Sequence, residues 1–272
     1  NVLTYNWEQM DNGISTQSPV ATSTNGPNFR SNPSSTSPTR YFPNLVDLNA
    51  GGPFTWEVLA SVSRTMDFRV TVRDNATGGA CNDHEDLTVT TDENSGPFLV
   101  DYPSANGINW PGLSSQTVSW SVAGTNAAPV ACSEVDILLS TDGGLTFPTV
   151  LASNVPNDGS QSVTAPNVAT TDAIVMVICS NGTFFDISDN PFEISAATFD
   201  YTISSATPAL SICQPLNAEY TIDIGAIGGY TDAVTLSASG VPAGASGTFS
   251  TNPVIPVGSS LFTTSNTGAS GT

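Results

Sequence analysis

The sequence predicts an all-β protein made of several β-sandwich domains in a row, and three observations support this prediction. Short segments alternate apolar and polar residues with a period of two, and no apolar stripe with helical spacing is found. Apolar residues make up 39% of the chain and charged residues only 11%. The remainder is rich in Ser, Thr, Asn, Gly and Pro, which suits short strands joined by many turns. The 272 residues correspond to two or three domains at the usual roughly 100–200 residues per domain.

The first domain is predicted to span residues 1–96. Its strands are expected at Leu3–Trp7, Phe54–Leu59, Phe68–Val72 and Leu87–Thr91. A polar connection of about residues 11–39 separates the first two strands. Connections of this length are uncommon in compact domains, so it is either a functional loop or a loosely ordered excursion.

The second domain, residues 97–196, has the short strands and frequent turns that are typical of immunoglobulin-like sandwiches. Its strands are expected at Phe98–Tyr102, Thr117–Val122, Val135–Ser140, Ser162–Ala165, Ala173–Cys179 and Phe192–Ile194, with Trp120 in the core. The third domain, residues 197–272, has expected strands at Phe199–Ile203, Glu219–Ile224, Ala233–Ser237, Thr248–Ser250 and Leu261–Thr264. Both outer domains lack strands of a complete sandwich, so we expect a natural polypeptide that is longer at both ends.

The charge of the chain restricts its partners. The 24 acidic and 5 basic residues give a net charge of −19, and lysine is absent. Such a surface repels phosphate backbones and anionic lipids, so nucleic acids and membranes are not expected partners. No stretch approaches the ~18 apolar residues of a membrane-spanning segment. An acidic surface attracts divalent cations, although the need for solubility also explains it.

The cysteines predict one disulfide. Cys132 precedes one apolar strand and Cys179 ends another in the second domain, so we expect them to be bonded, as is typical of an extracellular compartment. Cys81 and Cys213 fall in different domains and are expected to be unpaired, or to have partners outside this chain.

Several stretches resemble a known family. They include VLTYNWEQMD, NFRSNPSSTSPTRYFP, DFRVTVRDNATGGACNDHEDLTV, VDILLSTDGGLTF, FFDISDNPFEI, SICQPLNAEYTI and LSASGVPAGASGTFS. Together they resemble the region after the catalytic domain of secreted reprolysin-like zinc metallopeptidases of Bacteroidetes. The first domain also resembles polycystic-kidney-disease (PKD) type domains, whose LTYxW strand it shares. The resemblance implies tandem immunoglobulin-like or PKD-like domains that are extracellular or at the cell surface, after type IX secretion.

The catalytic motif of that family is absent. It requires H-E-x-x-H-x-x-G-x-x-H for zinc, whereas this chain has one histidine, His84. No G-x-S-x-G motif is present either. Glycoside hydrolysis requires a pair of carboxylates, and the 24 acidic residues offer many possible pairs. None of them lies in a motif that suggests a catalytic acid. We therefore expect neither bound zinc nor catalytic residues in this chain.

Calcium is the one cofactor that the sequence suggests. Carboxylates and amides gather in a glycine-containing segment between two expected strands, and the expected ligands are Asp74, Asn75, Asp83 and Asp86. Loop carboxylate and amide oxygens suit calcium, and glycine permits the turns that direct them inward. The alternative is a solvated hairpin loop.

Two further motifs are expected to have different roles. Residues 140–147, STDGGLTF, resemble an Asp-box, in which Asp and Ser or Thr side chains bond turn amides and the aromatic residue enters the core. This role is structural. Trp110 lies in the turn Asn109–Gly112 and is expected to be exposed, where its ring could stack on a sugar. Trp7, Trp56 and Trp120 are expected in the core.

Three classes of function follow from these observations. The first is a non-catalytic accessory region of a secreted or surface protein, a spacer or adhesion module whose partners are the other domains of its polypeptide or an extracellular protein or polysaccharide matrix. The second is a structural subunit of a fibre, in which the edge of one sandwich accepts a strand from its neighbour. The third is a carbohydrate-binding module that uses Trp110.

Overall fold

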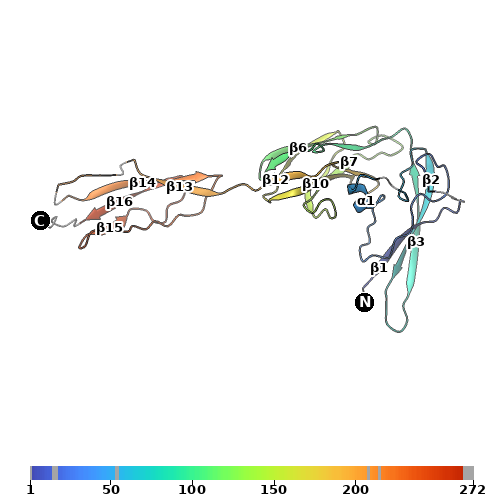
Figure 1. Cartoon of the computed structure of the whole chain (residues 1–272), viewed down its shortest axis with the longest axis horizontal. Coiled ribbons are helices and arrows are strands. Elements are labelled where there is room, and N and C mark those ends of the chain that lie inside the picture. The colour runs from blue at the N-terminus through green and yellow to red at the C-terminus, as the bar shows by residue number, and fades with distance from the viewer. Residues whose placement is uncertain (1, 14–17, 53–54, 207–208, 214–215, 266–272) are drawn as a thin grey trace. The chain divides into compact units, whose positions relative to one another are not determined.

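The computed structural model describes residues 2–13, 18–52, 55–206, 209–213 and 216–265, and within them the protein is almost entirely β-structure (Figure 1). The predicted all-β, sandwich-type fold is confirmed. The chain forms two compact units, Asn1–Ala196 and Ala197–Thr272, which are described separately. The division into three domains stays a prediction.

The first unit begins with an antiparallel sheet in the order β1 (Thr4–Gln9), β2 (Arg64–Arg73) and β3 (Asn82–Thr91). Alternate side chains of β2 are buried, as the period of a half-buried strand requires. Met66 and Phe68 of this strand pack with Phe29 from the long connection. The polar connection predicted at about residues 11–39 contains no strand in its described residues, in agreement with the sequence.

The strand predicted at Phe54–Leu59 is wrong within its described residues, 55–59. Only Glu57 forms a β-bridge there, to Phe29. The physical reason is the buried carboxylate of Glu57, which accepts a hydrogen bond from Arg40 at 2.6 Å and another from the backbone N–H of Asn44 at 3.1 Å. Hydrogen bonds of the Glu57 side chain therefore fix this segment, instead of the backbone hydrogen bonds of a strand.

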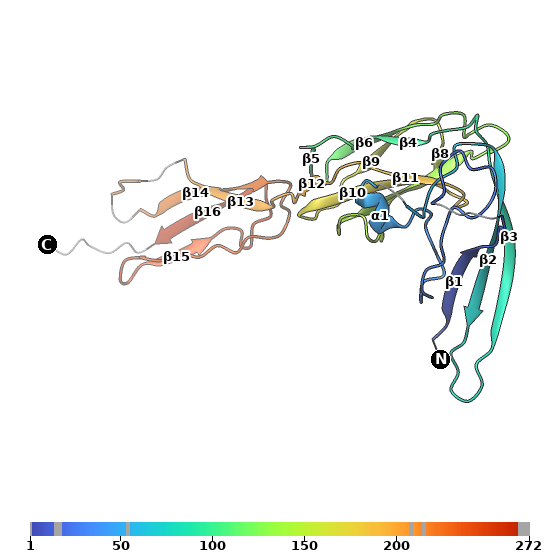
Figure 2. The same ribbon diagram turned by 45° about the vertical axis from the view of Figure 1, so that its right-hand side comes forward.

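A short helix that the sequence did not predict, α1 (Leu45–Asn49), follows this region. Asn44 caps its first turn, because the side-chain oxygen accepts a hydrogen bond from the N–H of Asp47 at 2.9 Å. Figures 1 and 2 both show α1 against the sheet that contains β10. Leu45 and Leu48 pack there with Tyr41, and the Tyr41 ring lies 5.0 Å from that of Phe185, centroid to centroid.

Two sheets form a sandwich in the rest of the first unit. One contains β4 (Leu99–Tyr102), β6 (Ser115–Ser121) and β9 (Ser160–Thr164) in this order. The other has the order β5-β12-β10-β7-β8, and β11 also pairs with β10. Its strands are β5 (Asn109–Pro111), β7 (Glu134–Ser140), β8 (Thr149–Pro156), β10 (Thr170–Cys179), β11 (Phe185–Ile187) and β12 (Phe192–Ser195). The strands predicted here are confirmed, and β5, β8 and β11 were not predicted.

Strand β10 is buried on both faces. Val175 and Val177 point into the sandwich core, whereas Ile174 and Met176 lie under α1 and Tyr41. This arrangement explains why the sequence AIVMVIC is continuously apolar, since a strand alternates apolar and polar residues only where one face meets water.

The second unit contains one sheet in the order β13 (Asp200–Ser204), β14 (Ala218–Ile227), β16 (Gly258–Ser265) and β15 (Ser246–Phe249). Its small core includes Ile224, Val234 and Val254. The strand predicted at Ala233–Ser237 is wrong, because Val234 makes only a single bridge, to Val254. The side chain of Asn252 occupies both backbone groups of Leu236, which prevents a longer ladder there.

Candidate functional site

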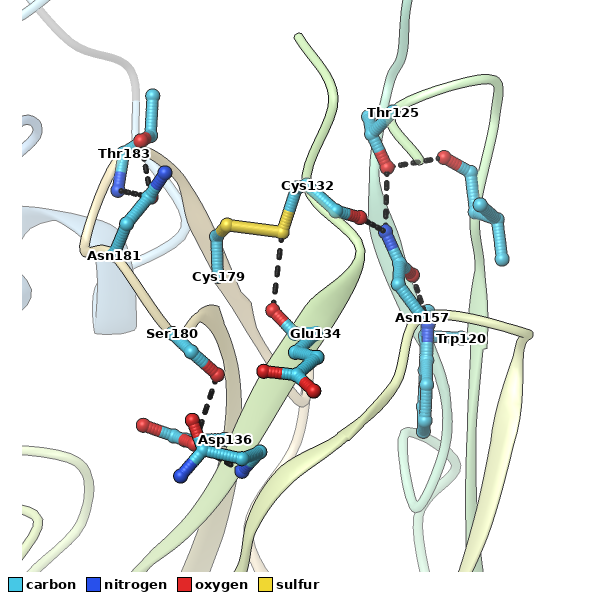
Figure 3. Close-up of a disulfide and its surroundings, with 12 residues drawn as sticks. Trp120, Thr125, Cys132, Glu134, Asp136, Asn157, Cys179, Ser180, Asn181 and Thr183 are labelled. Carbon is cyan, nitrogen blue, oxygen red and sulfur yellow. Dashed lines mark hydrogen bonds between the residues drawn. A yellow bond between two sulfur atoms is a disulfide. The ribbon is translucent and has the colours of Figure 1, made fainter. Parts of the chain in front are cut away.

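The predicted disulfide between Cys132 and Cys179 is present, with the two Cα atoms 6.1 Å apart. Figure 3 shows it joining the segment before β7 to the end of β10. Both cysteines are buried. Cys81 and Cys213 are exposed and free, as expected.

A buried amide beside the disulfide connects three parts of the sandwich (Figure 3). The side-chain nitrogen of Asn157 donates to the hydroxyl of Thr125 at 3.1 Å and to the carbonyl of Cys132 at 3.0 Å. Its side-chain oxygen accepts a hydrogen bond from the indole of Trp120 at 2.8 Å. Trp120 is 3% exposed, so its predicted position in the core is confirmed. Asn157 thus provides hydrogen-bond partners for the Trp120 indole, the Thr125 hydroxyl and the Cys132 carbonyl. Buried polar groups need such partners.

The structure does not bring together the four residues that were expected to bind calcium. The segment is a hairpin, because β3 already begins at Asn82. Asp83 and Asp86 lie three positions apart in this strand, so their side chains point to opposite faces. One carboxylate oxygen of Asp74 closes the turn by accepting hydrogen bonds from two backbone N–H groups, and the amide of Asn75 donates to the Thr4 hydroxyl at 3.0 Å.

Asp86 is paired with a cation of the neighbouring strand. Its two carboxylate oxygens accept hydrogen bonds from the Arg69 guanidinium at 2.6 and 2.7 Å, and these bonds lower the pKa of Asp86. Within the described residues, no three His, Cys, Asp or Glu side chains are grouped to hold a metal ion. Calcium binding by Asp74, Asn75, Asp83 and Asp86 stays a prediction, and it requires the hairpin to rearrange.

The Asp-box has the structural role that the sequence predicts. Asp142 accepts hydrogen bonds from the Ser140 hydroxyl at 2.6 Å, the Thr146 hydroxyl at 2.6 Å, and the N–H groups of Leu145 and Thr146 at 3.1 and 2.9 Å. The Ser140 hydroxyl in turn accepts the Gly144 N–H at 2.8 Å. Phe147 packs on the cluster around Met176. Burial raises the pKa of Asp142, but the hydrogen bonds from Ser140, Thr146 and Leu145 outweigh it and lower the pKa to about 2.

We expect Asp142→Ala to lower the free energy of unfolding by about 1 kcal/mol, since it leaves several turn groups without their partner, although solvent screens the exposed carboxylate. Because the folded pKa lies below the ordinary 3.8, this stabilisation is present at neutral pH and is lost as the pH falls from about 4 to about 2. Urea unfolding at pH 7 and pH 3, followed by circular dichroism, measures both effects. Asp158→Ala is the matched control, because it removes an exposed turn carboxylate with one long backbone contact, at 3.4 Å. Equal losses in the two variants would contradict the prediction.

Asp186 in β11 joins the two sheets of the sandwich at their edge. Its carboxylate accepts a hydrogen bond from the N–H of Val100 in β4 at 2.7 Å. Burial, with a smaller contribution from the charges of Asp189 and Asp101, raises the pKa of Asp186 to about 6, although the hydrogen bonds from the backbone of Val100 and Ile187 lower it. Asp186, Asp189 and Asp172 line a hollow of about 240 Å³ beside α1.

The half-buried Asp186 predicts a stability that falls as the pH rises. The folded pKa of about 6 lies above the ordinary 3.8, so the folded state favours the protonated acid. Its advantage is complete below about pH 4 and is lost as the pH rises through about 6, a change of roughly 2–3 kcal/mol. Asp186→Asn keeps an acceptor for Val100 and is expected to remove this change. Urea unfolding from pH 4 to pH 8 measures it, with Asp158→Asn as the control. An unchanged slope in Asp186→Asn would refute the assignment.

The expectation that Trp110 is exposed is wrong, because its side chain is 0% exposed. The ring centroid lies 4.6 Å from that of Phe192, and the indole N–H donates to the hydroxyl of Tyr102 at 3.3 Å. The physical reason is β5, a short strand that pairs in parallel with β12 and places Trp110 opposite Ile194. A sugar therefore has no access to this ring.

A different tryptophan borders a hollow of about 460 Å³ on the first unit. Trp56 is half-buried at its wall. The guanidinium carbon of Arg30 lies 5.7 Å from the centre of its ring, within the range of a cation–π contact. The remaining lining residues are Asn32, Asn44, Asp47, Thr55 and Glu57. All of them carry polar groups.

The sequence interpretation missed this hollow because it placed Trp56 in a strand core. A signal was present: Gly51, Gly52 and Pro53 directly precede this segment. Glycine and proline interrupt strands and mark turns. They indicate a loop, where an aromatic side chain is less readily buried.

A scan with protein-family models found no match to this chain, and a search of curated proteins found none either. In the described part of the chain, no helix is long and apolar enough to cross a membrane. The function is therefore argued from the residues and their geometry.

Proposed function

We propose that this chain is a non-catalytic accessory region of a secreted or cell-surface protein, by resemblance a zinc metallopeptidase, and that it serves as a spacer and adhesion module. A spacer has to resist bending, so its parts need to pack on one another. The disulfide between Cys132 and Cys179 suits an oxidising extracellular environment. The net charge of −19 suits a protein that has to stay soluble there.

One observation supports the spacer role. The segment that contains α1 contacts two sheets of the first unit, the N-terminal sheet and the sheet that contains β10. Leu45 and Leu48, which follow the N-terminal connection, cover the outer face of β10 with Tyr41. Arg40, just before them, donates to Glu57 and to the backbone carbonyl of Trp7 in β1 at 2.6 Å each. One short stretch of chain thus contacts both the N-terminal sheet and the sandwich, which limits bending between them.

The test uses antibodies against this chain on fractions of the cells that produce it. We expect a polypeptide larger than 28.0 kDa in the medium or at the cell surface, with Cys132 and Cys179 resistant to alkylation before reduction. The immunoprecipitate should cleave casein in a reaction that phenanthroline abolishes, whereas the purified chain should not. Recovery only from the cell interior would refute the secreted role, and an extracellular product without peptidase activity would refute the metallopeptidase link.

A fibre subunit is the second candidate, and the edge strand β13 favours it. All five of its residues are exposed, including Tyr201 at 42% and Ile203 at 61%. Ile203 lies opposite the buried Ile224 of β14, so it is on the core side of the sheet yet uncovered. Such an edge can accept a strand of another copy. The net charge of −19 opposes close approach of copies, which ranks this candidate second. Light scattering at rising protein concentration distinguishes a monomer from end-to-end polymers.

A further inference from the structure

The hollow beside Trp56 contains groups that can both donate and accept hydrogen bonds. No hydrogen bond of the Asn32 amide or the Thr55 hydroxyl to another described residue is found, so both can bond a ligand. The Arg30 guanidinium adds donors above the ring. Asp47 adds an acceptor, since only one of its carboxylate oxygens receives the Asn44 amide, at 2.6 Å.

The base of the hollow is held in place by buried interactions. Glu57 is 3% exposed, and its two carboxylate oxygens bond Arg40 and the N–H of Asn44. The Asn44 side chain caps α1. Because these groups are already paired, they position the lining and leave Trp56, Arg30, Asn32 and Thr55 for a ligand. A binding site that is largely formed beforehand loses less conformational entropy when the ligand enters.

The chemistry of the lining selects the class of ligand. An indole ring offers a flat apolar surface, which matches the C–H face of a pyranose, and sugar hydroxyls donate and accept hydrogen bonds as the surrounding groups do. Anionic ligands are disfavoured by Asp47, Glu57 and the net charge of −19. Cationic ligands are disfavoured by Arg30, which already lies over the ring.

We propose that the hollow formed by Arg30, Asn32, Asp47, Thr55 and Trp56 binds a neutral saccharide, with one pyranose ring stacked on the face of Trp56 that Arg30 leaves free. The inference goes beyond the accessory role and does not depend on it, because a spacer that binds no sugar remains a spacer. It also moves sugar binding from Trp110, which is inaccessible, to a tryptophan with open space beside it.

The experiment is affinity electrophoresis of the full chain in gels that contain one soluble polysaccharide each. The neutral probes are a β-glucan, a xyloglucan and a galactomannan, and the acidic probe is polygalacturonate. We expect retardation by at least one neutral probe and none by the acidic one. Trp56→Ala should weaken the affinity at least about tenfold, and Asn32→Ala about threefold. Tyr201→Ala, which removes an exposed aromatic ring of the second unit, is the matched control and should migrate like the wild type.

Folding is checked on the same proteins by circular dichroism. If Trp56→Ala is unfolded, Arg30→Ala and Asn32→Ala are used for the test, because Arg30 is exposed and Asn32 is half-buried. The proposal is overturned if no neutral polysaccharide retards the wild type, or if only the acidic polysaccharide does. It is also overturned if the folded hollow variants are retarded as strongly as the wild type.

Discussion

Trp110→Ala is expected to lower the free energy of unfolding of the first unit by about 3–5 kcal/mol, the usual loss for a large aromatic residue removed from a core. The indole is completely buried between Phe192 and Tyr102. Its removal leaves a cavity and also deprives the Tyr102 hydroxyl of its donor. A loss of this size is a large fraction of the roughly 5–15 kcal/mol that stabilises a typical domain.

Urea unfolding followed by circular dichroism measures this loss, and Trp56→Ala is the control. Both variants remove an indole, but Trp56 is only half-buried at the wall of a hollow, so we expect a loss of about 1 kcal/mol or less there. The two variants should also differ in affinity electrophoresis, because Trp56 lines the hollow and Trp110 does not. Only Trp56→Ala is expected to lose retardation by the polysaccharide. A loss below about 1 kcal/mol for Trp110→Ala would contradict its place in the core.

Removal of the disulfide should have the second large effect. The bonded cysteines are 47 residues apart, and closing a loop of this length in the unfolded chain corresponds to about 4 kcal/mol of stabilisation. The double variant Cys132→Ala/Cys179→Ala should therefore unfold at a markedly lower urea concentration than the wild type. Its native strands should persist, because β7 and β10 are also joined by their own ladder from Ile174↔Ser140 to Cys179↔Val135.

Cys81→Ser/Cys213→Ser is the matched control, since it replaces two exposed and free cysteines. We expect it to unfold like the wild type, with and without reductant. The wild type in reductant should approach the stability of the alanine double variant. If the wild type in reductant kept its full stability while mass spectrometry showed both thiols reduced, the predicted contribution of the disulfide would be wrong.

The sequence predicted those features of the fold that depend on local pattern. The alternation of apolar and polar residues in Phe68–Val72 predicted β2, the run AIVMVIC predicted β10, and the order of residues 140–147 predicted the Asp-box. Each of these signals lies within ten neighbouring residues. The disulfide could also be predicted, because both cysteines flank apolar strands of one domain.

Features that depend on distant partners could not be read from the sequence. Trp110 is buried because β5 pairs with β12, whose residues lie more than eighty positions later. Glu57 interrupts an expected strand because Arg40 lies beside it in space. The candidate hollow depends on the same folding of the connection around Trp56. The continuous apolarity of β10 did contain a hint of α1, since it requires a cover on each face of the strand.

The position of the disulfide also determines how the sandwich responds to a mechanical load. A force applied to the ends of the first unit passes from residue 132 to residue 179 through the sulfur atoms, so β7, β8, β9 and most of β10 bear no tension. At about 3.3–3.6 Å per extended residue, this bypassed loop stores roughly 160 Å of chain. When a pulling force separates the outer strands of such a tethered protein, the loop between the two cysteines therefore does not lengthen. Only reduction of the disulfide allows this part of the chain to extend.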